Sequence, residues 1–147
     1  MSGGEMHQRL QQAAARWLKR QQDGPHRRSG CPVVVLDIET CASETPDVIA
    51  WNSMISVMVE CKASRADFLR DAKKPHRILT QGIGNRRYYA APEGMLKPEE
   101  MPVDWGLLEM DERGVIHVAK DAEERALDCD SLMEERRVFV SIMRRKA

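Results

Sequence analysis

The stretch PDVIAWNSMISVMVECK, residues 46–62, holds two short apolar runs separated by a polar turn. The second run, residues 55–60, is rich in β-branched side chains and predicts a buried strand. The first run, residues 48–51, is expected to fold back beside it as a hairpin through the turn at residues 52–54. A strand hairpin at the centre of the chain indicates a fold built around a sheet.

Three charged side chains stand at the ends of this hairpin. Because successive side chains of a strand point to opposite faces, Glu60 and Lys62 are expected on one face and Cys61 on the other. Asp47 heads the first apolar run, so the hairpin would carry it toward the end of the second. The spacing therefore predicts that Asp47, Glu60 and Lys62 converge on one site.

Two carboxylates and a backbone carbonyl, that of Cys61, would form a hard-oxygen site suited to Mg²⁺ or Mn²⁺. Lys62 could then orient or help deprotonate a water nucleophile and offset charge in a phosphoryl transition state. Glu44, from the acidic segment before Asp47, is an additional candidate ligand, with a solvated loop carboxylate as the competing interpretation. The competing interpretation for Glu60 and Lys62 is an ordinary ion pair on a half-exposed strand.

The pair PD at residues 46–47, followed by ECK at residues 60–62, resembles the signature of the PD-(D/E)XK nuclease superfamily. That superfamily includes restriction endonucleases, phage exonucleases and junction resolvases. The continuation ASRADFLRDAK, residues 63–73, resembles small bacterial and phage members, including the MmcB-type DNA repair proteins, whose E-x-K strand runs into S-x-A-D-F. The similarity spans residues 33–92.

This resemblance implies a restriction-endonuclease-like core that binds Mg²⁺, with Mn²⁺ as a substitute, and cleaves DNA in repair, phage or mobile-element biology. It assigns Asp47 and Glu60 as metal ligands and Lys62 as the catalytic lysine. The superfamily often adds an acidic residue from its first helix, and Glu5 is the carboxylate that precedes Asp23 here.

A helix is expected directly after Lys62, because Ser64 and Asp67 have the spacing of an N-cap and its third helical position. Basic side chains near this helix and at the start of the next strand are candidate nucleic-acid contacts, namely Arg65, Lys73, Lys74, Arg86 and Arg87. Solvated surface residues are the competing interpretation.

The remaining periodicity predicts an α/β fold with a central mixed sheet of four to six strands flanked by helices. The expected elements are a helix over 5–22, an interior strand over 32–38, a strand over 86–91 parallel to the E-x-K strand, a hairpin of strands over 105–110 and 115–118, and a helix over 131–145. The last helix is expected to dock either on the sheet or on a second copy of the chain.

Length and composition fit one domain over residues 1–147, with 42% hydrophobic and 31% charged residues and a formal net charge of zero. No apolar run approaches the roughly 20 residues that cross a bilayer, and the N-terminus lacks a signal-peptide pattern, so no membrane contact and a cytoplasmic location are expected. The four cysteines form no C-x-x-C pair and are expected as free thiols rather than zinc ligands. The sequence contains no glycine-rich phosphate loop, so no nucleotide cofactor is expected.

Two classes of function remain: a Mg²⁺-dependent deoxyribonuclease, and a catalytically silent module of the same fold that binds nucleic acid or protein. The enzyme is favoured, because a site that had lost its catalytic activity would have no need to hold two carboxylates together against their mutual repulsion. A small domain without a specificity domain would dimerise or recognise DNA structure. The sequence leaves DNA against RNA, and endonuclease against exonuclease, undecided.

Overall fold

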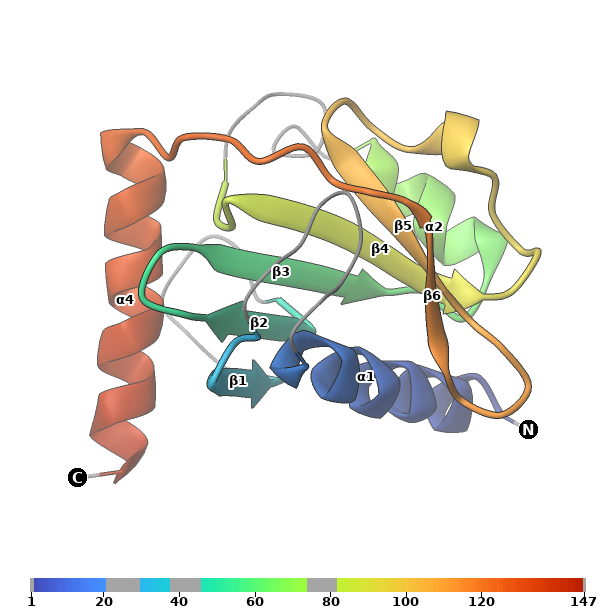
Figure 1. Ribbon diagram of the computed structural model, residues 1–147, viewed down its shortest axis with the longest axis horizontal. Coiled ribbons are helices and arrows are strands. Elements are labelled where there is room, and N and C mark those ends of the chain that lie inside the picture. Colours follow the sequence, from blue (N-terminus) through green and yellow to red (C-terminus); the bar gives the residue numbers. More distant parts are fainter. Residues whose placement is uncertain (1, 21–29, 38–45, 74–81, 147) are drawn as a thin grey trace.

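The computed structural model describes residues 2–20, 30–37, 46–73 and 82–146 (Figure 1). These residues form one six-stranded sheet in the spatial order β1-β2-β3-β4-β5-β6. The strands are β1 (Val33–Leu36), β2 (Val48–Trp51), β3 (Ser56–Cys61), β4 (Arg86–Pro92), β5 (Trp105–Met110) and β6 (Ile116–Lys120). The β3–β4 and β4–β5 pairs are parallel and the other three are antiparallel. The predicted α/β class with a mixed sheet flanked by helices is confirmed.

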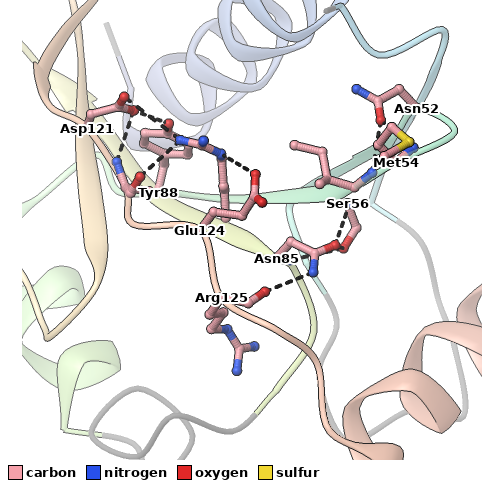
Figure 2. Close-up of polar contacts among 11 residues, drawn as sticks. Asn52, Met54, Ser56, Asn85, Tyr88, Asp121, Glu124 and Arg125 are labelled. Atoms are coloured by element: carbon pink, nitrogen blue, oxygen red, sulfur yellow. Dashed lines mark hydrogen bonds and ion pairs between the residues drawn. The ribbon is translucent and has the colours of Figure 1, made fainter. Parts of the chain in front are cut away.

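The expected central hairpin is formed by β2 and β3, with Val48 opposite Val59. Its turn is closed by Asn52, whose Oδ1 accepts hydrogen bonds from the backbone N–H groups of Met54 at 2.8 Å and Ile55 at 2.9 Å (Figure 2). An asparagine side chain that bonds its own backbone two residues on is a common turn former. The register of this hairpin brings the end of β3 beside the start of β2.

One face of the sheet is covered by helix α1 (Gly3–Lys19), which begins at the N-cap Ser2. The Ser2 hydroxyl accepts the backbone N–H of Glu5 at 3.2 Å. The buried face of the helix packs on alternate residues of the hairpin, in a cluster that includes Leu10, Ala14, Trp17, Val48, Val57, Val59 and Cys61. The predicted N-terminal helix is confirmed, and it ends at Lys19.

Helices α2 (Arg65–Ala72) and α4 (Cys129–Lys146) both pack into the core on the opposite face of the sheet. That core contains Phe68 of α2 and Val138 of α4 together with Met58, the residue between Val57 and Val59 on β3. In Figure 1 the two helices lie at opposite ends of the strands, α4 beside the β2–β3 turn and α2 beyond the end of β3. Of the two dockings left open for the last helix, on the sheet or on a second copy, the structure shows the one on the sheet.

A buried carboxylate fastens α4 to the sheet. Glu135 is 6% exposed and accepts hydrogen bonds from Trp51 Nε1 at 3.1 Å, Ser56 Oγ at 2.7 Å and the backbone N–H of Gly84 at 2.8 Å. The ring of Phe139 lies 4.3 Å from that of Trp51. Three donors on one carboxylate offset the cost of burying its charge.

The extended segment between β6 and α4 is tied to the starts of β3 and β4 (Figure 2). Asn85 accepts the backbone N–H of Ser56 through Oδ1 at 2.9 Å and donates from Nδ2 to the carbonyl oxygen of Arg125, also at 2.9 Å. The Tyr88 hydroxyl donates to Asp121 on the same segment. The bonds of Asn85 hold the end of the sheet opposite to the charged end of β3.

The expectation of an interior strand over 32–38 is wrong. Within the described part of the chain, β1 pairs with β2 alone and forms an edge of the sheet, with Val33 45% and Leu36 38% exposed. An apolar run reports that its residues are β-formers, but the order of strands depends on which partners the rest of the chain supplies. None of the helices that the structure describes is long and apolar enough to cross a membrane.

Candidate active site

A cleft of about 700 Å³ lies at the carboxyl end of β3. Residues from the start of α1, the end of β3 and the length of α2 line it: Gly3, His7, Asp47, Glu60, Cys61, Lys62, Ala63, Ser64, Asp67, Arg70 and Asp71. The structure thus brings together all three predicted catalytic residues, Asp47, Glu60 and Lys62.

Asp47 is held by contacts to two other elements. Its Oδ2 accepts the backbone N–H of Cys61 at 2.8 Å, and its Oδ1 lies 3.3 Å from Nε2 of His7 on α1. Val48 and Val59 are paired across the hairpin, so the next position in the register sets Asp47 beside Glu60. The two acidic residues of the motif, thirteen positions apart in the chain, become neighbours through antiparallel pairing.

Glu60 and Lys62 approach the cleft from the end of β3. Glu60 is only 6% exposed, and Lys62 follows the strand with its backbone N–H donated to the carbonyl of Ala90 at 2.9 Å. The Lys62 Nζ lies 3.6 Å from Oδ1 of Asp71, a residue of α2. Lys62 is therefore engaged in an ion pair at the wall of the cleft.

The Cys61 side chain lies on the other face, among the core residues under α1. Burial raises the pKa of its thiol well above the ordinary value, and the nearby negative charges of Asp47 and Glu60 raise it further. The thiol is therefore neutral and is not a nucleophile. Cys61 also belongs to the lining of the cleft, and its backbone carbonyl stays a predicted ligand.

Three cleft residues were not singled out from the sequence: Asp71, His7 and Arg70. Asp71 stands three residues after Phe68, and His7 three before Leu10, so helical periodicity sets each on the buried face of its own helix. A polar residue at such a position was the available signal. Arg70 pairs with Asp67 one turn earlier, and no comparable sequence signal distinguishes it from other surface arginines.

The cleft is rich in acidic groups. Asp47, Glu60, Asp67 and Asp71 line it, together with the cations Lys62 and Arg70 and with His7. An acidic cleft would repel a phosphate until a cation offsets its charge. Hard carboxylate oxygens of this kind are the donors that Mg²⁺ and Mn²⁺ accept.

The cleft offers a divalent cation a small number of protein ligands. In the described residues no three His, Cys, Asp or Glu side chains come together as a metal-binding group. Asp47 and Glu60 would supply two carboxylates, and backbone and water oxygens the remainder, which is a usual way for proteins to hold Mg²⁺. Glu44 lies outside the described residues, and Glu5 is exposed and lies outside the lining of the cleft.

The basic residues near α2 that were predicted to contact nucleic acid differ in how exposed and how engaged they are. Arg65 forms a two-pronged ion pair with Glu100, at 2.6 and 3.1 Å, and donates to the carbonyl of Met95 at 3.2 Å. Lys73 is exposed at the C-cap of α2, and Lys74 lies outside the described residues. Arg65 would have to leave Glu100 to contact a phosphate.

The predicted pair at the start of β4 is far along the strand from the cleft, beside the start of β3. Arg87 is 2% exposed, with its guanidinium 4.9 Å from the centre of the Trp105 ring. Burial at this level is inconsistent with the predicted DNA contact of Arg87, because the alternation of β4 turns this side chain into the core. Arg86 is half-buried and is paired with Glu124 at 3.3 Å.

No protein-family model matches this chain, and no curated protein matches it. A solved structure described as "SPO1766 protein of unknown function from Silicibacter pomeroyi" is similar to it, with a TM-score of 0.67 and 25% sequence identity. The similarity covers 95% of this chain and 88% of that one. The likeness supports the α/β fold.

Proposed function

We propose that this chain is a Mg²⁺-dependent nuclease of the PD-(D/E)XK type that hydrolyses phosphodiester bonds in DNA. The observation that carries the proposal is the meeting of Asp47, Glu60 and Lys62 in one cleft. The motif could have occurred by chance in residues that the fold separates.

In this proposal Asp47 and Glu60 hold the cation with the backbone carbonyl of Cys61. The cation, when bound, supplies Lewis acidity and a template for the phosphate oxygens. The hydrogen bond from the Cys61 N–H fixes Oδ2 of Asp47, and Oδ1 lies 3.3 Å from Nε2 of His7. Lys62 brings positive charge to the scissile phosphate and positions the attacking water.

The surroundings of the cleft suit a phosphate backbone. The cleft reaches the first turn of α1 at Gly3 and the N-cap of α2 at Ser64, and backbone N–H groups at helix starts favour anions. Arg70 adds a cation from α2. A homodimer that presents two such clefts to the two strands of a duplex belongs to the same proposal.

The alternative is a silent module that binds nucleic acid or protein in the same cleft. One observation favours it: the described residues offer two carboxylates, rather than three, to a cation. Such a module would bind nucleic acid in the presence of Ca²⁺ or Mg²⁺ and leave it intact.

Cleavage by the wild-type protein and by Lys62→Ala tests the proposal. With Mg²⁺ or Mn²⁺, the wild type should cut at least one of single-stranded, duplex, nicked and branched DNA. Lys62→Ala should cut about 10²- to 10⁴-fold more slowly, with DNA binding in Ca²⁺ nearly unchanged. Lys19→Ala is the matched control, an exposed lysine in the last turn of α1, outside the cleft, that should cut like the wild type.

If the wild-type protein leaves all four DNA substrates uncut, the proposal is rejected. If it cleaves RNA alone, the proposed substrate changes from DNA to RNA. Wild-type rates in Lys62→Ala would instead show that the active site lies elsewhere. Glu60 and Lys62 would then be a structural pair at the end of a strand.

A further inference from the structure

Asp71 is a buried acid at the wall of the cleft. It belongs to α2, is 2% exposed, and lies on the same helix face as Phe68, which packs into the core. A carboxylate taken out of water at this level is costly unless charged or hydrogen-bonding partners meet it. Its partners therefore indicate what it does.

One oxygen of Asp71 is fixed by an aromatic residue. The Tyr89 hydroxyl donates to Oδ2. The Tyr89 ring stacks on the Trp105 ring, with centroids 4.7 Å apart, and meets the Phe68 ring edge to face, with centroids 4.9 Å apart. Tyr89 is itself fully buried, so its hydroxyl has a defined position. The carboxylate of Asp71 is thus held in orientation from behind the cleft.

The other oxygen faces the predicted catalytic lysine. Asp71 Oδ1 lies 3.6 Å from Lys62 Nζ, and the Lys62 side chain is only 15% exposed. A lysine side chain is long and flexible, and without an anchor its ammonium would be drawn to the carboxylates of Asp47 and Glu60. There it would compete with a divalent cation for the same oxygens.

We propose that Asp71, oriented by Tyr89, is a positioning residue that holds the Lys62 ammonium at the α2 wall of the cleft. It acts through Lys62 and does not touch the substrate. The inference rests on the proposed function for its catalytic consequence, but the pairing of Asp71 with Lys62 is a property of the resting protein.

A double-mutant cycle in cleavage measures this dependence. Asp71→Asn should lower kcat by about 10-fold or more, while Lys62→Ala alone loses about 10²- to 10⁴-fold. If Asp71 acts through Lys62, the double variant should be no slower than Lys62→Ala. Losses that multiply, or a wild-type kcat in Asp71→Asn, would overturn the inference.

Two further variants control the cycle. Asp130→Asn removes an exposed acid in the first turn of α4, outside the cleft, and it should keep a wild-type kcat. Asp67→Asn removes the other acid of α2 that lines the cleft, paired with Arg70 rather than Lys62, and it is the control for the resonance of the Lys62 ammonium. Tyr89→Phe keeps the charge of Asp71 but removes the orienting hydroxyl. Tyr89→Phe should lower kcat when Lys62 is present and should have no further effect when combined with Lys62→Ala. If Asp71→Asn does not fold, Tyr89→Phe takes its place in the cycle.

A measurement without substrate separates this inference from the proposed function. The ¹⁵Nζ resonance of the Lys62 ammonium, identified by its loss in Lys62→Ala, should shift in Asp71→Asn and stay in place in Asp67→Asn. If the resonance shifts but the protein cleaves no substrate, the pairing of Asp71 with Lys62 stands and the proposed nuclease function is rejected. An unshifted resonance in Asp71→Asn would overturn the inference whatever the protein cuts.

Discussion

The side chain of Asp47 accepts a hydrogen bond from the backbone N–H of Cys61, with 2.8 Å between Oδ2 and the nitrogen. This bond joins the two halves of the motif, because Cys61 stands between Glu60 and Lys62 in the chain. Asp47 therefore has a structural role in the hairpin in addition to its proposed role as a metal ligand. The two roles make different predictions for the two acids.

Removal of either acid should abolish binding of Mn²⁺, but only the Asp47 variant should lose stability. Asp47→Ala gives up the bond to Cys61 and should lower the free energy of unfolding by about 1–2 kcal/mol. Glu60→Gln keeps the shape of the side chain and relieves repulsion between two carboxylates, so its stability should be unchanged or higher. Calorimetric titration and denaturant unfolding measure the two effects. Unchanged Mn²⁺ affinity in both variants would exclude this metal site.

Deletion of Arg70 should change the salt dependence of DNA binding. Arg70 lines the cleft. Loss of one phosphate contact makes the negative slope of log affinity against log salt shallower by about 0.9 on B-form DNA. Arg65→Gln is the control, because Arg65 is also paired with an acid but lies outside the lining of the cleft. A wild-type slope in Arg70→Gln together with a shallower slope in Arg65→Gln would place the DNA over Glu100 instead.

The Arg65–Glu100 pair should make stability depend on pH in acid. The hydrogen bond from Arg65, aided by that from the Lys97 N–H, lowers the pKa of Glu100 from 4.5 to about 2. A lowered carboxyl pKa stabilises the fold above the unfolded value, and this contribution is lost as pH falls from 4.5 through about 2. The stability gap between the wild type and Glu100→Gln should therefore shrink over that range in denaturant unfolding. A gap of constant size from pH 6 to pH 2 would contradict the pairing.

Glu135 should be among the residues most sensitive to truncation outside the cleft. Glu135→Ala leaves the Trp51 indole, the Ser56 hydroxyl and the Gly84 N–H without their buried acceptor, which should cost about 2–4 kcal/mol of stability. Glu134→Ala is the matched control: its carboxylate pairs with the half-exposed Arg137 one turn away, and its loss should cost less than about 1 kcal/mol. Thermal unfolding compares the two, and equal effects would show that Glu135 does not anchor α4.

Local sequence was sufficient to predict the elements that build the site. Strand alternation assigned Cys61 to the core and Glu60 to the cleft, and the antiparallel hairpin set Asp47 beside them. Ser64 was recognised as an N-cap from its spacing to Asp67, and its hydroxyl does accept the Asp67 N–H at 3.2 Å. These features depend on contacts between residues close in the chain, so periodicity and capping rules describe them.

The sequence by itself determined the α/β class, the central hairpin and the convergence of two acids and a lysine. Only the tertiary structure decided which charges are surface and which are core: Arg87 lies buried over Trp105, and Asp71 lies buried behind Lys62. It also decided that β1 is an edge strand. The reason is the same in each case, because the burial of a charge and the order of strands depend on partners distant in the chain, and no local pattern of hydrophobicity records which partners those are.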